Sequence, residues 1–321
     1  MQLLLTNKPR LDRIEAMADH TNKVRASKLK TLRPRKHELD FFIADEIELS
    51  SFRDEMASME HPFFALKAGD TKVREYNNGV TSVTIRPAAE IGLATVFDKD
   101  VWIYSISKLQ ESMNNNEPIS RTVCFTPYDF FVTTNRAKCG RAYNDLEKAL
   151  DRLSGTRITT NIVYSDEKQE SIGFGLIDEW RIIDEKKGKL DIGMVEVTLP
   201  NWLYQALQKK KILKISPDYF RIRKAVDRRI YEIVRKHCGN QGEFTISLEK
   251  LHLKTGSTAN KAEFKRMLKN LAKDNDLPDY SLRYDAERDV VIFNNRNLTP
   301  EQEEKEQNRE QGKGLSENSF T

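Results

Sequence analysis

The sequence predicts an α+β fold of two winged-helix domains in tandem, because one order of elements occurs twice along the chain. That order is helix, short strand, helix, turn, helix and a pair of strands, which describes a helix-turn-helix followed by a β-hairpin wing. The apolar positions of the third helix match between the two copies, and basic charge is concentrated in the second copy. These three observations set the fold class and the kind of partner.

In the first copy, apolar spacing predicts a helix over 98–113 and a short strand over 122–125. Thr126 then suits the N-cap of a second helix, with Pro127 at its first position and Asp129 near the positive end of its dipole. A turn at 135–140 then leads into a predicted third helix over 141–153, which Gly155 can end. Two predicted wing strands follow over 157–164 and 171–183, joined by a turn at 165–170.

The second copy repeats this order about 120 to 127 residues later. At an offset of 121 residues the third helices align, which pairs Tyr143 with Phe264, Leu146 with Met267 and Leu150 with Leu271. The predicted elements are helices over 225–238, 248–255 and 261–273, with Ser247 capping the second of them, and strands over 243–246, 280–284 and 290–293.

Composition divides the chain into four parts. We expect a flexible basic arm over 1–36, with at most a short helix near 11–18, and a disordered acidic tail over 297–321. Between them we expect a first winged-helix domain with an N-terminal extension over 37–199 and a second winged-helix domain over 200–296. The first of these domains includes a predicted strand over 80–87. The net charge is +7 over 1–36, +12 over 201–273 and −3 over 301–321, within a total of +4. Because Lys and Arg replace the counterions condensed on phosphates, this clustering favours nucleic acid as the partner over a merely solvated surface.

Other classes of protein are disfavoured. Of 321 residues, 38% are hydrophobic and 32% charged, and no apolar run reaches the roughly 18 to 20 residues that cross a bilayer, so we expect a cytoplasmic protein without a signal peptide or a membrane partner. Cys124, Cys139 and Cys238 form no CxxC pair, which argues against a zinc ribbon and a disulfide framework.

The sequence also lacks the motifs that the main enzyme classes need. It has no GxxxxGK[ST] phosphate loop, no GxSxG turn and no HExxH helix, and its five histidines are never spaced two apart as in the metal site of a rolling-circle nicking enzyme. Asp98 and Asp100 fit charges at a helix start better than a catalytic acid pair. We therefore expect no enzymatic activity, no cofactor and no metal.

Candidate DNA contacts lie on and just before the third helices, opposite the apolar stripe. Arg and Asn at such positions can read base edges whereas Lys mainly contacts phosphates, which makes Arg141, Asn144, Asn260 and Arg266 the candidates for base reading. The alternative at each single position is a solvated side chain, so the prediction concerns the patch more than its members. The full set, with Arg157 and Arg283 on the predicted wings for an adjacent minor groove, is Asn135, Arg136, Lys138, Arg141, Asn144, Lys148, Arg152, Arg157, Lys254, Ser257, Thr258, Asn260, Lys261, Lys265, Arg266, Lys269, Lys273 and Arg283. A further basic run, expected to contact the DNA backbone, comprises Lys209, Lys210, Lys211, Lys214, Arg221, Arg223, Lys224, Arg228 and Arg229.

Several segments resemble the plasmid replication initiator protein A family. They are His61-Pro62-Phe63-Phe64-Ala65-Leu66, the run GLATVFDKD from Gly92 to Asp100, Ile119-Ser120-Arg121-Thr122, the run GFGLID from Gly173 to Asp178 with Trp180, Arg228-Arg229-Ile230-Tyr231-Glu232, and Arg235-Lys236-His237-Cys238-Gly239. The resemblance covers about 60–294 and leaves out the arm and the tail. Because these segments are largely apolar or stand at helix starts, we interpret them as markers of the fold rather than as base contacts.

The resemblance implies a bacterial initiator of plasmid replication that binds directly repeated sites, or iterons, at a plasmid origin through two winged helices. Such proteins help to open an adjacent AT-rich segment and recruit the host initiator and the replicative helicase without cutting DNA. The resemblance also implies a protein that represses its own gene as a homodimer and acts at the origin as a monomer, with a role in plasmid copy control. Two third helices in successive major grooves, about 34 Å apart, would give a site of about 20 base pairs.

Two other functions fit the same residues. A winged-helix transcriptional repressor would bind its site without distorting the neighbouring DNA. A protein interaction module would show only non-specific DNA affinity, with a Kd of about 10⁻⁴ to 10⁻⁶ M, and the clustering of basic charge argues against it.

Overall fold

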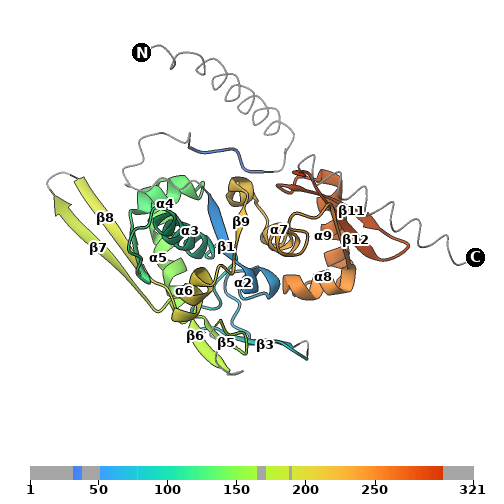
Figure 1. The fold of residues 1–321 in the computed structure, drawn as a ribbon, viewed down its shortest axis with the longest axis horizontal. Coiled ribbons are helices and arrows are strands. Elements are labelled where there is room, and N and C mark those ends of the chain that lie inside the picture. The colour runs from blue at the N-terminus through green and yellow to red at the C-terminus, as the bar shows by residue number, and fades with distance from the viewer. Residues whose placement is uncertain (1–31, 38–50, 78, 165–170, 188–189, 299–321) are drawn as a thin grey trace, which may run out of the picture.

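The computed structural model describes residues 32–37, 51–77, 79–164, 171–187 and 190–298, with the backbone alone over 184–187 and 190–192. Within these residues the chain forms a mixed helix-and-sheet fold, as predicted, with two halves that meet at the centre of the molecule (Figure 1). The helix expected at 11–18 lies outside the described residues. So do the arm and the tail whose flexibility was expected, apart from residues 32–36, 297 and 298.

The first half contains a helix-turn-helix whose elements begin where the local signals place them. Thr126 is the N-cap of the second helix, and its hydroxyl accepts a hydrogen bond from the backbone N–H of Asp129 at 3.1 Å. Pro127 stands at the first helical position, where its missing N–H costs nothing. The elements are α3 (Asp100–Asn114), β4 (Thr122–Phe125), α4 (Pro127–Thr133), α5 (Gly140–Gly155), β7 (Glu179–Lys187) and β8 (Leu190–Thr198).

The second half repeats this order. Its elements are α7 (Ala225–His237), β10 (Glu243–Ser247), α8 (Leu248–Thr255), α9 (Lys261–Asp274), β11 (Tyr280–Asp285) and β12 (Val290–Asn295). In both halves the first short strand pairs with the last strand, which gives the sheet orders β4-β8-β7 and β10-β12-β11. The two halves therefore share one topology, a helix-turn-helix followed by a hairpin wing.

The wing of the first half is the β7–β8 hairpin, so the prediction that 157–164 and 171–183 form this wing is wrong. Those stretches supply β5 (Arg157–Thr160), β6 (Ile172–Gly175) and only the first part of β7. The strands β5 and β6 belong instead to a four-stranded sheet of order β2-β3-β5-β6, together with β2 (Arg74–Asn77) and β3 (Ser82–Arg86).

The cause of this difference is a long-range strand pairing. Ile158 of β5 stands opposite Ile85 of β3, and both side chains are buried. The strand predicted over 80–87 is thus present as β3, and it offers β5 an apolar partner more than 70 residues earlier in the chain. Local alternation shows that a strand exists, but it does not show the partner with which the strand pairs.

The predicted register between the third helices is also wrong. Tyr143 is 46% exposed, whereas Phe264, its predicted counterpart, is buried. The buried stripes are Leu146, Leu150 and Leu153 in α5, and Phe264, Leu268 and Leu271 in α9. Their identical spacing gives an offset of 118 residues instead of 121, so α5 extends almost one turn further ahead of its core stripe than α9 does.

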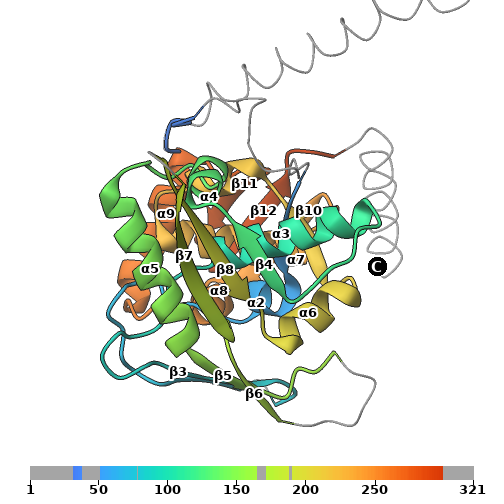
Figure 2. The ribbon, with the colours of Figure 1, turned by 90° about the vertical axis from the view of Figure 1, so that its left-hand side faces the viewer.

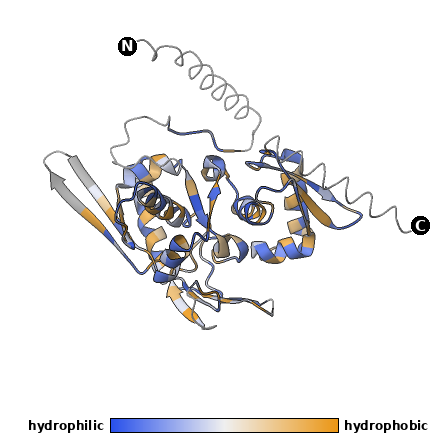
Figure 3. Ribbon diagram, in the orientation of Figure 1, coloured by the Kyte–Doolittle hydropathy of each residue, from blue (hydrophilic) through white to orange (hydrophobic). Residues whose placement is uncertain are grey.

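The two hydrophobic cores meet between the halves. The first core takes in Trp202 and Leu203 of α6 (Asn201–Gln208), which follows the domain boundary expected at 199. The second core takes in Met59 of α2 (Met56–Glu60) and Ile103 of α3. Figure 3 shows hydrophobic and hydrophilic residues mixed within the helices, as expected where one face of each helix is buried.

Between the halves, β1 (Phe52–Glu55) pairs with β9 (Ile212–Ile215) in an antiparallel ribbon, and a 3₁₀ helix, η1 (Pro217–Arg221), leads from β9 to α7. The pairing places Phe52 opposite Ile215, and Figure 1 shows the two strands side by side at the centre of the molecule. The ribbon thus joins a strand from the N-terminal extension to the segment that enters the second helix-turn-helix.

Buried ion pairs cross between the halves at the start of α3. The ammonium group of Lys99 donates to Asp54 at 2.7 Å and lies 3.1 Å from Glu232 of α7, and all three side chains are buried. Glu232 also accepts a hydrogen bond from the Tyr219 hydroxyl at 2.6 Å and lies 2.8 Å from Arg229. Burial raises the pKa of Asp54 to about 7, an effect that the nearby ammonium of Lys99 opposes. Because buried charges are tolerated only when they are paired, the packing of α7 against α3 requires these partners to meet.

Arg228 makes a second buried connection. Its guanidinium donates to Asp100 at 2.6 Å and to the carbonyls of Phe220 and Ile222 at 3.1 and 3.2 Å. The side chains of Arg228 and Arg229 are each 2% exposed. The prediction that these two arginines contact the DNA backbone is therefore wrong, because both guanidiniums are buried and hydrogen-bonded inside the protein.

Replacing Arg228 with Gln should lower the free energy of unfolding by about 3 to 5 kcal/mol, because the buried carboxylate of Asp100 would lose its closest cation. Chemical denaturation monitored by circular dichroism measures this change. Arg181→Gln is the matched control, since Arg181 forms an exposed ion pair with Glu179 and its loss should leave the unfolding midpoint nearly unchanged. Equal midpoints for the two variants would contradict this assignment.

His61 gives the stability a pH dependence. Burial lowers its pKa to about 4, whereas a histidine in the unfolded chain titrates near about 6.5. Between these values the folded protein binds fewer protons than the unfolded chain, so His61 makes the protein less stable as the pH falls. In His61→Gln the loss of unfolding free energy between pH 7 and pH 5 should be smaller than in the wild type. An unchanged loss would show that His61 does not contribute.

Candidate nucleic-acid interface

The two third helices, α5 and α9, lie toward one side of the molecule, while α6 lies toward the opposite side (Figure 2). Third helices of winged-helix domains are the elements that enter the major groove. Each of them buries its apolar stripe and leaves the opposite face to solvent. The common side of α5 and α9 is therefore the candidate nucleic-acid interface.

Helix α9 presents a row of cations on its exposed face. Lys261, Arg266, Lys269 and Lys273 are exposed, and Lys265 is half-buried. The structure thus brings together on one helix surface all five basic residues that the sequence predicted there. Helix α9 carries only two carboxylates, Glu263 and Asp274, against these five cations, so its exposed face has a net positive charge.

Two asparagines flank this row. Asn260 is the N-cap of α9, and its side-chain oxygen accepts a hydrogen bond from the backbone N–H of Glu263 at 2.9 Å, which leaves its amide N–H groups for a ligand. Asn270 is exposed one turn after Arg266. Asn270 was not among the predicted contacts, although its spacing of four residues from Arg266 places the two side chains on one face of the helix.

The wing of the second half aligns a stripe of lysines along α9. Asp289, in the turn between β11 and β12, lies 3.3 Å from Lys261 and 3.4 Å from Lys265, and it accepts a hydrogen bond from the Tyr284 hydroxyl at 2.5 Å. The Tyr284 ring faces the ammonium groups of Lys265 and Lys269, at 5.0 and 5.8 Å from its centroid. The Tyr284 hydroxyl and the two lysines lower the pKa of Asp289. The wing therefore holds three lysines, spaced four residues apart, in one line.

Helix α5 is less positive. Arg141, Asn144 and Lys148 are exposed as predicted, but Asp145 and Glu147 are exposed beside them. The guanidinium of Arg141 lies 3.8 Å from the Asp145 carboxylate. The exposed charges of α5 thus largely cancel, whereas those of α9 add.

The turn before α5 adds a cation and an aromatic ring. Lys138 is exposed, lies 4.4 Å from the centroid of the Tyr128 ring and donates to the Tyr128 hydroxyl at 3.0 Å. Tyr128 and Tyr143 are large exposed aromatic side chains that the sequence analysis did not select. Tyr128 falls in the first turn of the predicted second helix, and Tyr143 was placed on the buried stripe of the third helix. Charge and periodicity therefore did not indicate that either ring is exposed to a ligand.

Three of the predicted contacts are engaged in ion pairs within the protein. The pairs are Arg136 with Asp100 at 2.9 Å, Arg152 with Asp98 at 2.7 Å, and Lys254 with Glu60. None of the three cations is fully exposed, so the structure does not bring them to the open face of α5 or α9. The sequence could not reveal these pairs, because each carboxylate lies at least 36 residues from its cation.

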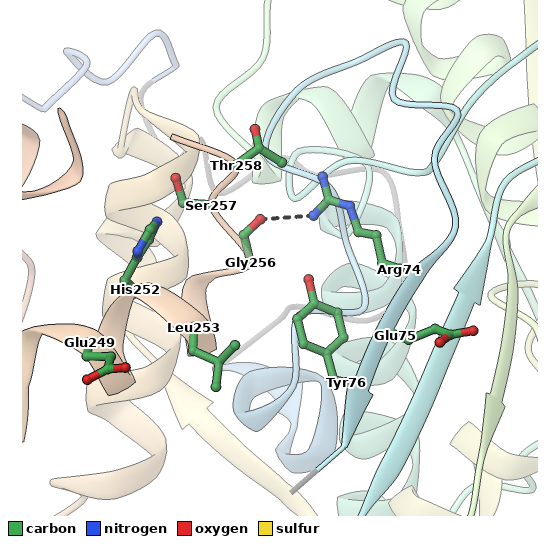
Figure 4. Close-up of a pocket in the computed structure, with 9 residues that line it drawn as sticks. All are labelled: Arg74, Glu75, Tyr76, Glu249, His252, Leu253, Gly256, Ser257 and Thr258. Carbon is green, nitrogen blue, oxygen red and sulfur yellow. Dashed lines mark hydrogen bonds between the residues drawn. The ribbon is translucent and has the colours of Figure 1, made fainter. Parts of the chain in front are cut away.

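Ser257 and Thr258 line a cavity of about 450 Å³ between the turn that precedes α9 and strand β2 (Figure 4). Across the cavity, the Arg74 guanidinium donates to the carbonyl of Gly256 at 3.0 Å. Gly256 has a φ of +67°, and a Cβ atom there would lie 2.7 Å from a side-chain atom of Pro62. Only glycine fits this position, so the turn before α9 is held closely against the first half.

The remaining predicted residues lie on other surfaces. Arg283 is exposed on β11, a strand of the second wing, as predicted. Arg157 is exposed on β5, which belongs to the four-stranded sheet, so the prediction that it lies on a wing is wrong. Asn135 stands in the turn before α5 with a φ of +55°, and its side chain hydrogen-bonds to the described part of the N-terminal arm.

In the described part of the chain, no group of three or more His, Cys, Asp or Glu side chains is placed to hold a metal ion. Cys124, Cys139 and Cys238, all within the described ranges, form no disulfide. None of the helices in the described ranges is long and apolar enough to cross a membrane.

Comparison with known proteins gives a family and a fold. The sequence profile of the family "Replication initiator protein A" matches residues 53–282. A replication protein of Wigglesworthia glossinidia brevipalpis is 58% identical over 266 residues, which span 83% of this chain and 96% of that protein. Among solved structures, domains 2 and 3 of RctB superpose with a TM-score of 0.56 at 10% identity, over 75% of this chain and 96% of theirs, and therefore share its fold. The Pi initiator protein, solved in complex with iteron DNA, gives a TM-score of 0.46 at 16% identity, over 64% of this chain and 92% of that one.

Asp289→Asn should raise the affinity for a random-sequence DNA duplex by roughly 3- to 10-fold at low salt, because it releases Lys261 and Lys265 to phosphates. Fluorescence anisotropy with a labelled duplex measures this change. Glu287→Gln removes the same charge from the same turn without releasing a lysine, so its effect should be smaller. Equal effects of the two substitutions would show that only the net charge matters.

Proposed function

The chain belongs to the replication initiator protein A family, and we propose that it is a sequence-specific DNA-binding initiator that acts at repeated sites in a plasmid origin. The observation that carries this proposal is the placement of α5 and α9 toward one side of a body whose halves are joined by buried ion pairs. A protein built in this way can present two recognition helices to one face of a duplex.

The two winged helices contribute differently to DNA affinity and to sequence specificity. Helix α9, with its exposed cations and the two flanking asparagines, supplies most of the phosphate affinity and reads bases through Arg266, Asn260 and Asn270. Helix α5, where acidic and basic side chains alternate, adds little net attraction and contributes selectivity through Arg141 and Asn144. Specificity therefore depends on both helices, whereas the salt dependence comes mainly from the second.

The fixed spacing of the helices determines the site. If α5 and α9 enter successive major grooves, about 34 Å apart, one molecule covers about 20 base pairs. Direct repeats of such a site would align several molecules on one face of the DNA. Their combined binding free energy would then favour the opening of a neighbouring AT-rich segment, where TA steps deform readily.

The family resemblance adds three further parts to the proposal. These are recruitment of the host initiator and the replicative helicase, action without strand cleavage, and a homodimeric form that represses the gene of the protein itself. The residues that would make these contacts are not assigned.

A footprint of the full chain on plasmid DNA that carries its gene and flanking sequence, at about 150 mM salt with competitor DNA, tests the proposal. We expect regularly spaced protection of direct repeats, together with permanganate-reactive thymines in an adjacent AT-rich stretch. Arg266→Ala should weaken binding by about 1 to 3 kcal/mol and relax the preference at one base pair of each repeat. Lys209 and Lys211 lie at and just after the C-terminal end of α6, so the proposal gives them no contact with the DNA backbone, in contrast to what the sequence predicted for them. Lys209→Ala is therefore the control and should leave the footprint unchanged.

Other outcomes would contradict the proposal. Protection of a single inverted repeat at a promoter, without reactive thymines, would identify a transcriptional repressor. The absence of sequence-specific protection would exclude an initiator that recognises repeated sites by itself.

A further inference from the structure

The segment Leu32–His37, which we call the strap, lies across both halves of the protein. At its N-terminal end Leu32 is buried in the second core. The backbone N–H of Arg33 donates to the carbonyl of Arg221 at 2.9 Å, and the Arg221 guanidinium donates back to the carbonyl of Arg33 at 2.7 Å. This reciprocal pair fixes the strap on η1, just before α7.

The C-terminal end of the strap binds the first helix-turn-helix. The backbone N–H of Lys36 donates to the side-chain oxygen of Asn135 at 2.7 Å, and the Asn135 amide donates to the carbonyl of Pro34 at 3.2 Å. The His37 ring hydrogen-bonds to the carbonyl of Arg136 at 2.7 Å. Asn135 and Arg136 form the turn between α4 and α5, so the strap ends beside the start of the first recognition helix.

The position of the strap relates it to both recognition helices. Its one end adjoins the turn that leads into α5. Its other end adjoins the start of α7, which lines one cavity together with Glu263 and Met267 of α9. Figure 2 shows the strap at the top of the molecule, on the side toward which α5 and α9 lie. The strap therefore runs from the turn that leads into α5 to the segment that leads into α7, on the side of the molecule toward which both recognition helices lie.

This surface carries unbalanced positive charge. Partial burial and the neighbouring guanidiniums of Arg228 and Arg223 lower the pKa of Arg33. Among the described residues no carboxylate lies within 4.0 Å of the Arg33 guanidinium, and the same holds for the side chains of Lys36 and Arg223. Arg35 reaches Asp218 only at 3.4 Å, and Asp218 already binds Arg221 at 2.8 Å. Arg35, Lys36 and Arg223 are exposed, and Arg33 is half-buried and attracted by Asp100 from beyond 4.0 Å. Of these four cations, only Arg35 has a carboxylate within 4.0 Å among the described residues, and it shares this carboxylate with Arg221. An anion would stabilise such an arrangement.

We propose that Arg33, Arg35 and Lys36 of the strap, together with Arg223, form a binding surface for the DNA phosphate backbone between the two major grooves that α5 and α9 enter. This inference rests on the proposed function and assigns to it a third region of contact. Backbone phosphates are the anions that such a surface would meet on a duplex spanned by α5 and α9. Guanidinium groups suit phosphate because their planar forks donate two parallel hydrogen bonds.

The test is the salt dependence of binding to origin DNA, measured by fluorescence anisotropy on the full chain. For Arg33→Gln/Arg223→Gln, the slope of log K against log salt concentration should fall by about 2, since each neutralised phosphate contributes about 0.9. Affinity at about 150 mM salt should fall about 10-fold or more. Arg35→Gln/Lys36→Gln is a second variant whose side chains are exposed, so it keeps the fold and should reduce the slope in the same direction.

Lys209→Gln/Lys211→Gln is the matched control, because it removes two exposed positive charges next to α6, on the opposite side of the molecule. Its slope should fall by less than half as much as that of either strap variant. A strap variant that keeps the wild-type unfolding midpoint and the wild-type slope would overturn this inference while leaving the proposed function intact. Failure of the wild-type protein to bind origin DNA would instead contradict the proposed function itself.

Discussion

The structure depends on a small set of charges buried where its two halves meet. Lys99 and Asp100, at the start of α3, bind Glu232 and Arg228 of α7, and each of these side chains is almost fully withdrawn from water. An unpaired charge at such a place would cost several kcal/mol, so the two helices are stable together only in the arrangement that pairs them. The ion pairs therefore specify one relative position of the two winged helices rather than a range of positions.

Three other sets of contacts also fix the position of one half of the protein relative to the other. The β1–β9 ribbon joins the N-terminal extension to the segment that enters the second helix-turn-helix. Gly256 lets the turn before α9 approach Pro62 and accept a hydrogen bond from Arg74. The strap bonds at its two ends to η1 and to the turn before α5. Because these contacts hold both recognition helices, the distance between α5 and α9 becomes a property of the folded chain. Such a fixed distance is what a reader of two successive grooves requires.

The sequence predicted those parts of the structure that depend on neighbours along the chain. Caps such as Thr126 and Ser247, and the apolar stripes of the helices, act over three or four residues, so the three helices of each helix-turn-helix were identified. The short helices α2 and α6 were not predicted. The first wing was misplaced because β5 pairs with β3, a choice that local alternation does not reveal. Among the site residues, the exposed cations of α9 followed from the helical pattern. Arg228 and Arg229 were misassigned, because their carboxylate and carbonyl partners in the fold were invisible to a count of charge. The same limit hid the ion pairs of Arg136 and Arg152.

The buried ion pairs and the β1–β9 ribbon predict that the two winged helices bind DNA as one rigid unit. The most direct measurement is the affinity for sites in which base pairs are inserted between the two half-sites of one footprint. Inserting five base pairs, about half a helical turn, rotates one half-site to the other face of the duplex. A rigid reader should then bind no more tightly than it binds a single half-site, and an insertion of ten base pairs should not restore the affinity. If both longer sites bound with nearly the original affinity, the two domains would be flexibly linked, which would contradict a rigid arrangement.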